Sequence, residues 1–460
     1  MAGSKKPRSV AIACQGGGSH AAFCAGALKV LLAGQEEGDY RVTGMSGTSG
    51  GAICAALAWY GMAAGRSDPA GAARKAAQLL DGFWTDNSAA LWWEKWWNEA
   101  GQLVARAPLE PKWSPYAFPM QESLELAATV HERLGLLGPR LEFVDLAALL
   151  DKHAPDLHRI EFDDILLLLG AVDVGSGAFK AFSSRKREIS VDAVLASAAL
   201  PTLFRAVRID GRAYWDGLFS QNPPLSNFVA DPETADQKPD EIWVLQVNPQ
   251  QGSEPTTAWD IEDRRNELAG NLSLNQELQF IETVNRWLIE GRMECGKQGL
   301  PASHKPITVY RIVMDVGALG EGMGELDLAS KLDRRADLIA ALMAQGETQA
   351  RLFMPVRRFL SGVWCEADPK ARQAHAGRLF AGGRERRMPE LQALHHAYRK
   401  FLIAVDDLQI RGESADRGAV HLRWHSHGIS REGAALRRAG RASFMVADGT
   451  LREIGITADG

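Results

Sequence analysis

The stretch Gly47-Thr48-Ser49-Gly50-Gly51 decides the fold of this 460-residue chain. Residues 41–45 before it are short, apolar and partly β-branched, which predicts a buried strand, and the Ala- and Leu-rich residues 52–62 after it predict a helix. A serine at the centre of G-x-S-x-G between a strand and a helix is the pattern of a nucleophile elbow. The turn strains the serine backbone, and the glycines let strand and helix approach closely. An ordinary glycine-rich turn is the alternative interpretation.

A second glycine-rich turn precedes the elbow. Residues 9–14 predict a first strand, which is followed by Gln15-Gly16-Gly17-Gly18-Ser19-His20 and then by an Ala-rich helix. The backbone N–H groups of such a turn suit either a dinucleotide or the oxyanion of an attacked carbonyl group. A dinucleotide site needs an acidic residue at the end of the next strand, whereas that strand leads into Ser49. The sequence therefore favours an oxyanion hole.

A late aspartate is a candidate base for the serine. Residues 206–209 and 212–216 predict two strands around an Asp-Gly turn, and Asp216 ends the second strand before Gly217. The ligand crevice of a parallel α/β sheet lies at the carboxyl ends of its strands, where such a carboxylate would be catalytic. An ordinary Asp-Gly β-turn explains the same dipeptide equally well.

The order of elements predicts the fold class and the domains. Strands and helices alternate over residues 9 to about 315, which predicts a three-layer α/β domain with a central, mostly parallel sheet. We expect the catalytic domain over residues 8–330, a helical extension over 331–365 and a linker over 366–389. Residues 390–460 predict a small α+β module, with a helix over 391–405.

Composition excludes several classes of protein. The formal net charge of −5 argues against nucleic-acid binding, which usually needs a basic surface. The apolar run Val10–Cys14 is too short for a signal peptide, and no run approaches the roughly 20 residues that span a bilayer. Five scattered cysteines predict reduced, buried thiols: Cys14, Cys24, Cys54, Cys295 and Cys365. We therefore expect a cytoplasmic protein, with peripheral contact at the inner membrane face as an option.

Tryptophans gather in the segment Phe83–Trp97, which holds Trp84, Trp92, Trp93, Trp96 and Trp97. Paired tryptophans at 92–93 and 96–97 cannot all point to one face of a helix. Some are therefore expected to be exposed at a membrane surface, a subunit contact or an apolar substrate entrance. The proline-interrupted residues 108–119 predict a loop that could act as a lid.

Three histidines lie close together in the tail, at His421, His425 and His427. No cysteine or carboxylate stands near them at the spacing of metal ligands, so the sequence predicts no metal site.

Taken together, four ordered motifs over roughly residues 8–330 resemble the patatin-like phospholipase family. Gln15-Gly16-Gly17-Gly18 is similar to its oxyanion loop, and Gly47-Thr48-Ser49-Gly50-Gly51 to its nucleophile motif. Ala196-Ser197-Ala198-Ala199-Leu200-Pro201, with Phe204, is similar to a third segment of the family. Tyr214-Trp215-Asp216-Gly217, with Asn222-Pro223, is similar to its Asp-Gly motif.

The resemblance implies a serine acyl hydrolase that cleaves lipid carboxylic esters with a Ser–Asp dyad and no histidine. Ser49 would be the nucleophile and Asp216 the general base. The oxyanion hole would be formed by Gly16, Gly17 and Gly18, and the other motif glycines would be Gly47, Gly51 and Gly217. No metal or organic cofactor is implied. The implied partner is a lipid or other ester, with possible membrane contact through residues 84–97.

The chain departs from the family pattern at two points. His20-Ala21 stands where the family usually has Arg or Lys and then Gly, which puts one anion-binding side chain in doubt. Leu218 replaces a small residue beside Asp216. Ser330-Lys331-Leu332-Asp333 is similar to an extension of some bacterial patatin-like proteins, and the tail from about residue 390 is similar to nuclear-transport-factor-2-like folds.

Other functions stay open at this point. A Ser-His-Asp esterase would use a histidine after the acid, for which His304, His395 and His396 are candidates. A binding or scaffolding protein on the same fold is favoured by His20 and Leu218. The ester, the acyl chain, the positional preference and the oligomeric state do not follow from the sequence.

Overall fold

The computed structural model describes residues 6–459 except 93, 97, 100, 101, 103–144, 202, 203, 233, 253, 257, 294–301, 320–325, 367 and 381–388. The predicted lid over residues 108–119 and Cys295 lie outside the described residues. Within the described part, the other four cysteines form no disulfide. None of the helices described there is long and apolar enough to cross a membrane.

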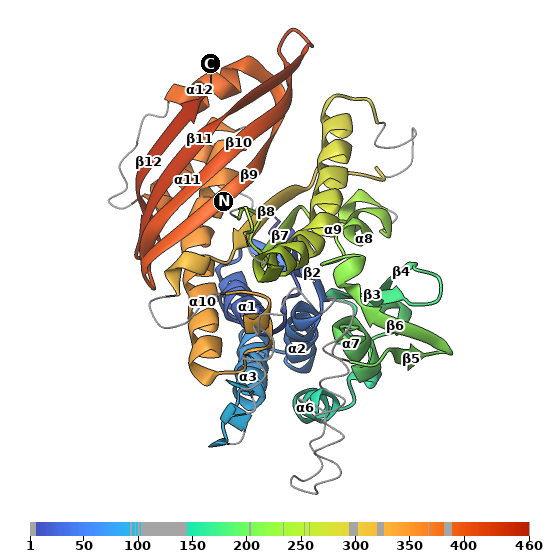
Figure 1. The fold of residues 1–460 in the computed structure, drawn as a ribbon. Coiled ribbons are helices and arrows are strands. Elements are labelled where there is room, and N and C mark those ends of the chain that lie inside the picture. Colours follow the sequence, from blue (N-terminus) through green and yellow to red (C-terminus); the bar gives the residue numbers. More distant parts are fainter. Residues whose placement is uncertain are drawn as a thin grey trace, which may run out of the picture.

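A mixed sheet of eight strands forms the centre of the molecule (Figure 1). Its strands lie in the order β5-β6-β3-β2-β1-β7-β8, and β4 pairs with β3. The bounds are β1 Arg8–Cys14, β2 Tyr40–Thr48, β3 Leu166–Asp173, β4 Phe179–Ser183, β5 Val207–Ile209, β6 Arg212–Asp216, β7 Glu241–Gln246 and β8 Thr308–Val313. The pairs from β3 through β2, β1 and β7 to β8 are parallel, whereas β4 and β6 are antiparallel to β3. The predicted α/β class with a mostly parallel central sheet is confirmed.

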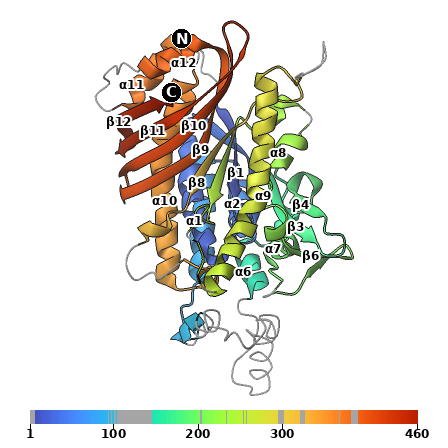
Figure 2. The ribbon, with the colours of Figure 1, turned by 45° about the horizontal axis from the view of Figure 1, so that its top comes forward.

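Helices cover both faces of this sheet, as the turned view in Figure 2 shows. In β1, Val10 and Ile12 face one core, whereas Ala11 and Ala13 face the other. The first face carries α1 Ala22–Ala33, α2 Gly50–Ala64, α3 Pro69–Asn87, α6 Leu146–His153, α7 Val191–Ala198 and α10 Ala336–Phe359. The second face carries α8 Ser226–Ala230 and α9 Ala258–Ile289. Because both faces are covered, the central strands need continuous apolar runs such as LLLLGAVD in β3.

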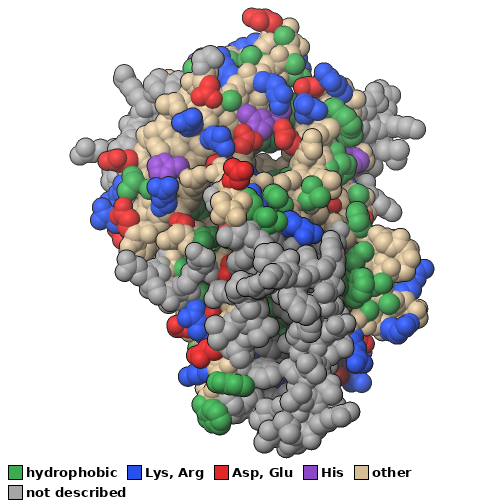
Figure 3. Space-filling view, viewed as in Figure 1, with side chains coloured by type: hydrophobic (Ala, Val, Ile, Leu, Met, Phe, Trp, Pro, Cys, Tyr) green, Lys and Arg blue, Asp and Glu red, His purple; other side chains and the backbone are tan. Residues whose placement is uncertain are grey.

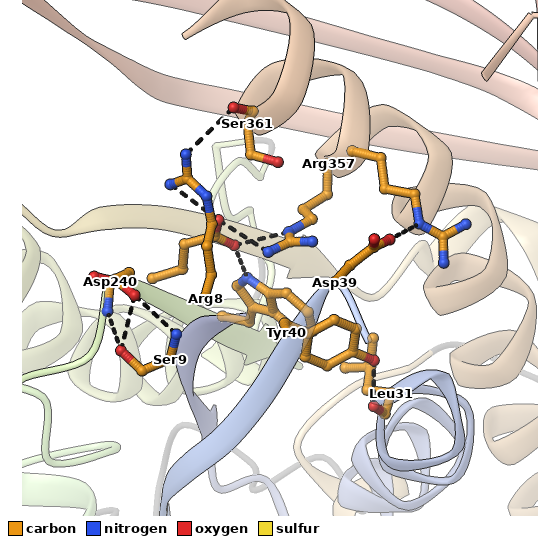
Figure 4. Close-up of polar contacts among 11 residues, drawn as sticks. Arg8, Ser9, Leu31, Asp39, Tyr40, Asp240, Arg357 and Ser361 are labelled. Atoms are coloured by element: carbon orange, nitrogen blue, oxygen red, sulfur yellow. Dashed lines mark hydrogen bonds and ion pairs between the residues drawn. The ribbon is translucent and has the colours of Figure 1, made fainter. Parts of the chain in front are cut away.

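A buried ion pair fixes α10 to the sheet (Figure 4). The Nε of Arg357 lies 2.9 Å from Oε2 of Glu241 in β7, and the side chains are 2% and 0% exposed. The guanidinium also lies over the rings of Tyr40 and Trp243, 5.3 and 5.4 Å from their centroids. Glu241 also lies 3.6 Å from Arg8, whereas removing Glu241 would leave the charge of Arg357 buried and unpaired, so the contact ties the extension firmly to the domain.

The C-terminal residues form an antiparallel four-stranded sheet, drawn in red at the top of Figure 1. Its order is β12-β11-β10-β9, with bounds β9 Tyr398–Ser414, β10 Arg417–Ser430, β11 Ala435–Ala447 and β12 Thr450–Ala458. Two helices precede it, α11 Pro369–Leu379 and α12 Pro389–Ala397. Phe359 and Trp364 pack edge to face on Phe444 and Trp424, so this sheet shares a core with α10.

Two expectations for this region differ from the structure. The helix predicted over residues 391–405 ends at Ala397, and β9 begins at Tyr398. The apolar residues 401–405 suit a helix locally, but pairing of β9 with β10 over the whole strand satisfies their backbone groups instead. Residues 366–389, predicted as a linker, contain α11.

Candidate active site

Ser49 lies between the end of β2 and the start of α2. Its φ of 56° and ψ of −131° fall in a region that costs a residue other than glycine about 1–3 kcal/mol. Its N–H donates to the carbonyl oxygen and to the hydroxyl of Ser197, each at 3.1 Å. Its own carbonyl accepts from the N–H groups of Ala52 and Ile53 in α2. These bonds hold the strained backbone, and Ser49 stays partly exposed.

Two glycines allow the backbone segments at this turn to touch. A Cβ on Gly51 would lie 2.3 Å from the carbonyl oxygen of Cys14, and one on Gly47 would lie 2.3 Å from the carbonyl oxygen of Gly51. No side chain fits at such distances, so β1, β2 and α2 pack backbone to backbone here. Glycine is therefore required at both motif positions because a side chain would clash with the neighbouring backbone.

The register of the sheet brings Asp216 to the level of Ser49. Thr48 pairs with Gly170 in β3, and the next residue, Ala171, pairs with Asp216 in β6. β6 is antiparallel to β3, which corrects the expectation that Asp216 ends a parallel strand. Its position follows instead from this register and from its N–H, which donates to the carbonyl of Ala199 at 2.9 Å.

The carboxyl group of Asp216 is almost fully buried. Its Oδ1 accepts from the N–H of Leu218 at 2.8 Å, and the side chain of Ser49 hydrogen-bonds to it. Burial raises the pKa of Asp216 to about 7, although both hydrogen bonds act to lower it. A carboxyl group with a pKa near neutrality can take up and return a proton at physiological pH. Among the described residues, no histidine side chain hydrogen-bonds to Ser49 or Asp216.

The glycine-rich loop lies against the elbow. A Cβ on Gly16 would lie 2.8 Å from Cβ of Ser49, and one on Gly50 would lie 2.6 Å from the carbonyl oxygen of Gly18. The N–H of Gly16 donates to Oδ1 of Asn222 at 2.7 Å. Gly16 was predicted as an oxyanion donor, but Asn222 already occupies its N–H. In the part of the chain that the structure describes, the N–H groups of Gly17 and Gly18 have no acceptor, and both residues are partly exposed.

Buried amide side chains hold this loop in place. Oε1 of Gln15 accepts from the N–H groups of Val247 and Asn248 at 3.0 and 2.9 Å, and its Nε2 donates to Asn271 on α9 at 2.9 Å. Nδ2 of Asn248 donates to the carbonyl of Gly16 at 3.2 Å. Because both ends of each amide are bonded, the loop is fixed between β7 and α9.

The two departures from the family pattern have clear structural consequences. His20 is buried, and its Nε2 lies 2.8 Å from the hydroxyl of Ser330. Burial, together with the charge of Lys331, lowers the pKa of His20 to about 3, so the ring is neutral and supplies no positive charge to an anion. The side chain of Leu218 lies against Gly270 on α9, while its N–H still binds Asp216.

Sequence reasoning gave no role to two residues that position the site. Ser197 accepts from the N–H of Ser49 and donates to the carbonyl of Gly170 at 2.6 Å. Asn222 holds Gly16 and donates to the carbonyl of Gly270 at 3.3 Å. Both residues belong to motifs that resemble the family, Ser197 before Pro201 and Asn222 before Pro223. Their place in these motifs is the sequence feature that could have indicated a role in the site.

Some of the tryptophans are exposed, as predicted. Trp84 is buried in α3, whereas Trp92 and Trp96 are 81% and 60% exposed; Trp93 and Trp97 lie outside the described residues. The segment that carries them contacts the extension, because Asn98 donates to Asp333 at 2.8 Å. A Cβ on Gly18 would lie 2.1 Å from the carbonyl oxygen of Lys331, so the same part of the extension also touches the glycine loop.

Comparison with known proteins assigns part of the chain to a family. Residues 12–229 match the patatin-like phospholipase family and form a domain of that family. A search of curated proteins gives no match.

The solved structures that are similar to the chain include the following three. VipD from Legionella pneumophila is 14% identical, with a TM-score of 0.31 over 75% of this chain and 68% of that chain. The ExoU–SpcU complex of the type III secretion system of Pseudomonas aeruginosa is 16% identical, with a TM-score of 0.23 over 81% and 66%. An NTF2-like protein of unknown function from Exiguobacterium sp. 255-15 is 18% identical, with a TM-score of 0.18 over 23% and 98%.

Proposed function

We propose that this protein is a serine acyl hydrolase that cleaves lipid carboxylic esters, with Ser49 as nucleophile and Asp216 as general base. The observation that carries the proposal is the buried carboxyl of Asp216, which has a pKa raised to about 7 and a hydrogen bond from Ser49 at a strained turn. The family match supports the reaction class, because patatin-like proteins are generally lipid acyl hydrolases.

In the first half-reaction, Asp216 takes the proton of the Ser49 hydroxyl as Oγ attacks the ester carbonyl carbon. The N–H groups of Gly17 and Gly18 face the oxyanion that forms, and each such donor typically contributes about 3 kcal/mol. Collapse of the tetrahedral intermediate breaks the ester C–O bond. Asp216 then gives its proton to the leaving alcohol, and an acyl-enzyme on Ser49 remains.

In the second half-reaction, water replaces the alcohol. Asp216 takes a proton from the water as its oxygen attacks the acyl carbonyl, and the same N–H groups hold the second oxyanion. Release of the fatty acid returns the proton to Ser49 Oγ. The two half-reactions use the same base, Asp216, for their proton transfers, so this mechanism needs no histidine.

Labelling with a fluorophosphonate tests the nucleophile. The wild-type chain is expected to take up one phosphonyl group, and peptide mapping should place it on Ser49. Ser176→Ala, in the exposed turn between β3 and β4, is the matched control and should label like wild type. A chain that folds but takes up no label, or takes it up equally as Ser49→Ala, would favour the binding or scaffolding alternative.

We further propose that the exposed tryptophans contact the lipid surface. Trp92 and Trp96 lie one helical turn apart, and tryptophan is favoured at the interface between membrane and water. The double change Trp92→Ala, Trp96→Ala should weaken binding to phospholipid vesicles and leave hydrolysis of a soluble nitrophenyl ester unchanged. Equal vesicle binding by the wild type and the double variant would contradict this role. A panel of phospholipid, neutral lipid and thioester substrates then identifies the ester.

A further inference from the structure

Two distant parts of the chain bring three metal-ligating side chains together. Glu282 comes from α9, and His425 and His427 come from β10 in the C-terminal sheet. Nε2 of His425 lies 3.0 Å from Nε2 of His427, and Oε1 of Glu282 lies 3.3 Å from each of these nitrogens. All three atoms therefore point at a common centre.

The separations between these atoms fit a metal ion. Zinc binds imidazole nitrogen and carboxylate oxygen at about 2.0–2.2 Å in tetrahedral sites, which places neighbouring ligand atoms about 3.4 Å apart. The observed 3.0 and 3.3 Å are close to that spacing. Two imidazoles and one carboxylate also form a donor set that zinc uses when a fourth position is left for water or a substrate.

A neighbouring carboxylate orients one of the ligands. Oδ2 of Asp406 in β9 lies 2.8 Å from Nδ1 of His425. A carboxylate on the second ring nitrogen is the usual outer partner of a metal-bound histidine, because it fixes the Nδ1–H tautomer and directs the Nε2 lone pair at the ion. His427 is 1% exposed, so its ring is held in place by packing.

A cavity of about 230 Å³ adjoins the cluster. Its lining includes Glu282 and His425, together with polar side chains such as Gln279, Asn285 and Arg311. On the face drawn in Figure 3, histidine and acidic side chains lie together beside an opening below the C-terminal sheet. A ligand on the open metal position would have space and polar partners there.

We propose that Glu282, His425 and His427 form a zinc site with three protein ligands and a fourth position that opens into this cavity. The imidazole pair favours zinc over magnesium or calcium, which take oxygen ligands. The ion would connect α9 to β10 and so join the C-terminal sheet to the second face of the central sheet, independently of the active site.

Protonation of His425 is the alternative explanation for these short contacts. Hydrogen bonds to Asp406 and Glu282 raise the pKa of His425 to about 9, so without an ion the cluster is a protonated ion-pair network. Zinc binding to the full-length chain separates the two interpretations. After treatment with a chelator and its removal, titration with Zn²⁺ followed by calorimetry and elemental analysis should give one ion per chain. Mg²⁺ and Ca²⁺ in excess should not displace it.

Variants test the ligands. Glu282→Gln and His425→Ala each remove a partly exposed ligand and should weaken zinc binding at least about 100-fold, with circular dichroism showing an intact fold. Asp406→Asn keeps all three ligands and should weaken it about 10- to 100-fold. His421→Ala is the matched control, because His421 lies on the same strand but is exposed and outside the cluster.

Three results would overturn the proposal. One is a wild-type chain that binds no zinc under these conditions, which would leave the ion-pair network as the interpretation. Another is a His421→Ala variant that loses zinc as His425→Ala does. The third is a Co²⁺-loaded chain without the intense visible absorption of tetrahedral coordination, or one in which Glu282→Gln leaves that spectrum unchanged.

Discussion

The Ser49 site and the Glu282–His425–His427 cluster both combine residues that are far apart in the chain, yet only the first has a local sequence signature. At the Ser49 site, the backbone itself must take special conformations: a positive φ at Ser49 and contacts too close for any Cβ at Gly47 and Gly51. Such demands restrict residue types along short stretches, and motifs result. Metal ligands need only side-chain atoms at the right distances, so ordinary helix and strand positions suffice. The difference shows that sequence motifs reveal sites with a special backbone conformation more readily than sites made only of side-chain atoms.

The largest expected effect separates the two sites directly. Ser49→Ala should lower ester hydrolysis by about 10⁴-fold or more, since loss of a nucleophile removes the covalent route. Zinc binding by the same variant should equal that of wild type, because the cluster lies on other elements. Rates on a nitrophenyl ester and zinc calorimetry on one preparation measure both. Hydrolysis that survives this change would end the assignment of Ser49.

A second prediction concerns the rigid attachment of the extension, on which the cluster depends. Arg357→Met should destabilise the fold by up to about 3–5 kcal/mol, because it removes the nearest counter-charge of the buried Glu241 and leaves only Arg8, 3.6 Å away. Arg358→Met is the control: Arg358 pairs with partly exposed acids, and its loss should cost about 1 kcal/mol or less. Urea unfolding of both variants gives the two free energies. Equal losses of unfolding free energy in the two variants would show that the buried ion pair stabilises the fold no more than the exposed one.

The third prediction tests whether the elbow needs its neighbours. Ser197→Ala removes the hydroxyl that accepts from the N–H of Ser49, and displacement of a reacting group commonly costs about 10- to 100-fold in rate. The loss should appear in kcat with KM unchanged, and Ser197→Thr should restore part of it. A change in KM alone would point to substrate binding instead of positioning.

The smallest expected effect is the pH dependence of the active site. Asp216 must be ionised to act as base, so kcat/KM should rise about tenfold between pH 6 and pH 8 around a pKa of about 7. Because burial raises this pKa above the value of the unfolded chain, the carboxyl stabilises the fold at low pH, and this contribution is lost as pH rises toward 7. Asp216→Asn should therefore raise the melting temperature more at pH 8 than at pH 5. A flat activity profile over this range would exclude Asp216 as the base.

The core of the fold and the placement of the site were largely predictable. The strands at residues 9–14 and 41–45 and the helix after Ser49 follow from local patterns, because buried parallel strands need continuous apolar runs. The antiparallel pairing of β6 with β3 was not predictable, since the residue pattern of a short strand does not indicate the direction in which it pairs. The end of α12 at Ala397 was also missed, because pairing with β10 outweighs a locally helical pattern.

Assignments to single atoms needed the structure. Gly16 belongs to the glycine motif, but only the fold shows that Asn222 takes its N–H. His20 stands out in the sequence as a departure, but its neutral, buried state depends on Ser330 and Lys331 from the extension. These partners are more than 200 residues away, so no local pattern contains them.

By itself, the sequence determined the family resemblance and the turn at Ser49 between a strand and a helix, and the resemblance implied the pairing of that serine with Asp216. The motifs that carry the resemblance are visible in the sequence because glycine contacts and strained turns restrict neighbouring residues along the chain. Only the tertiary structure decided which N–H groups of the glycine loop have no acceptor among the described residues, and only it placed Glu282 beside His425 and His427. The physical reason is that hydrogen bonds and metal ligands act over about 2–3.5 Å in space, whatever their separation in sequence.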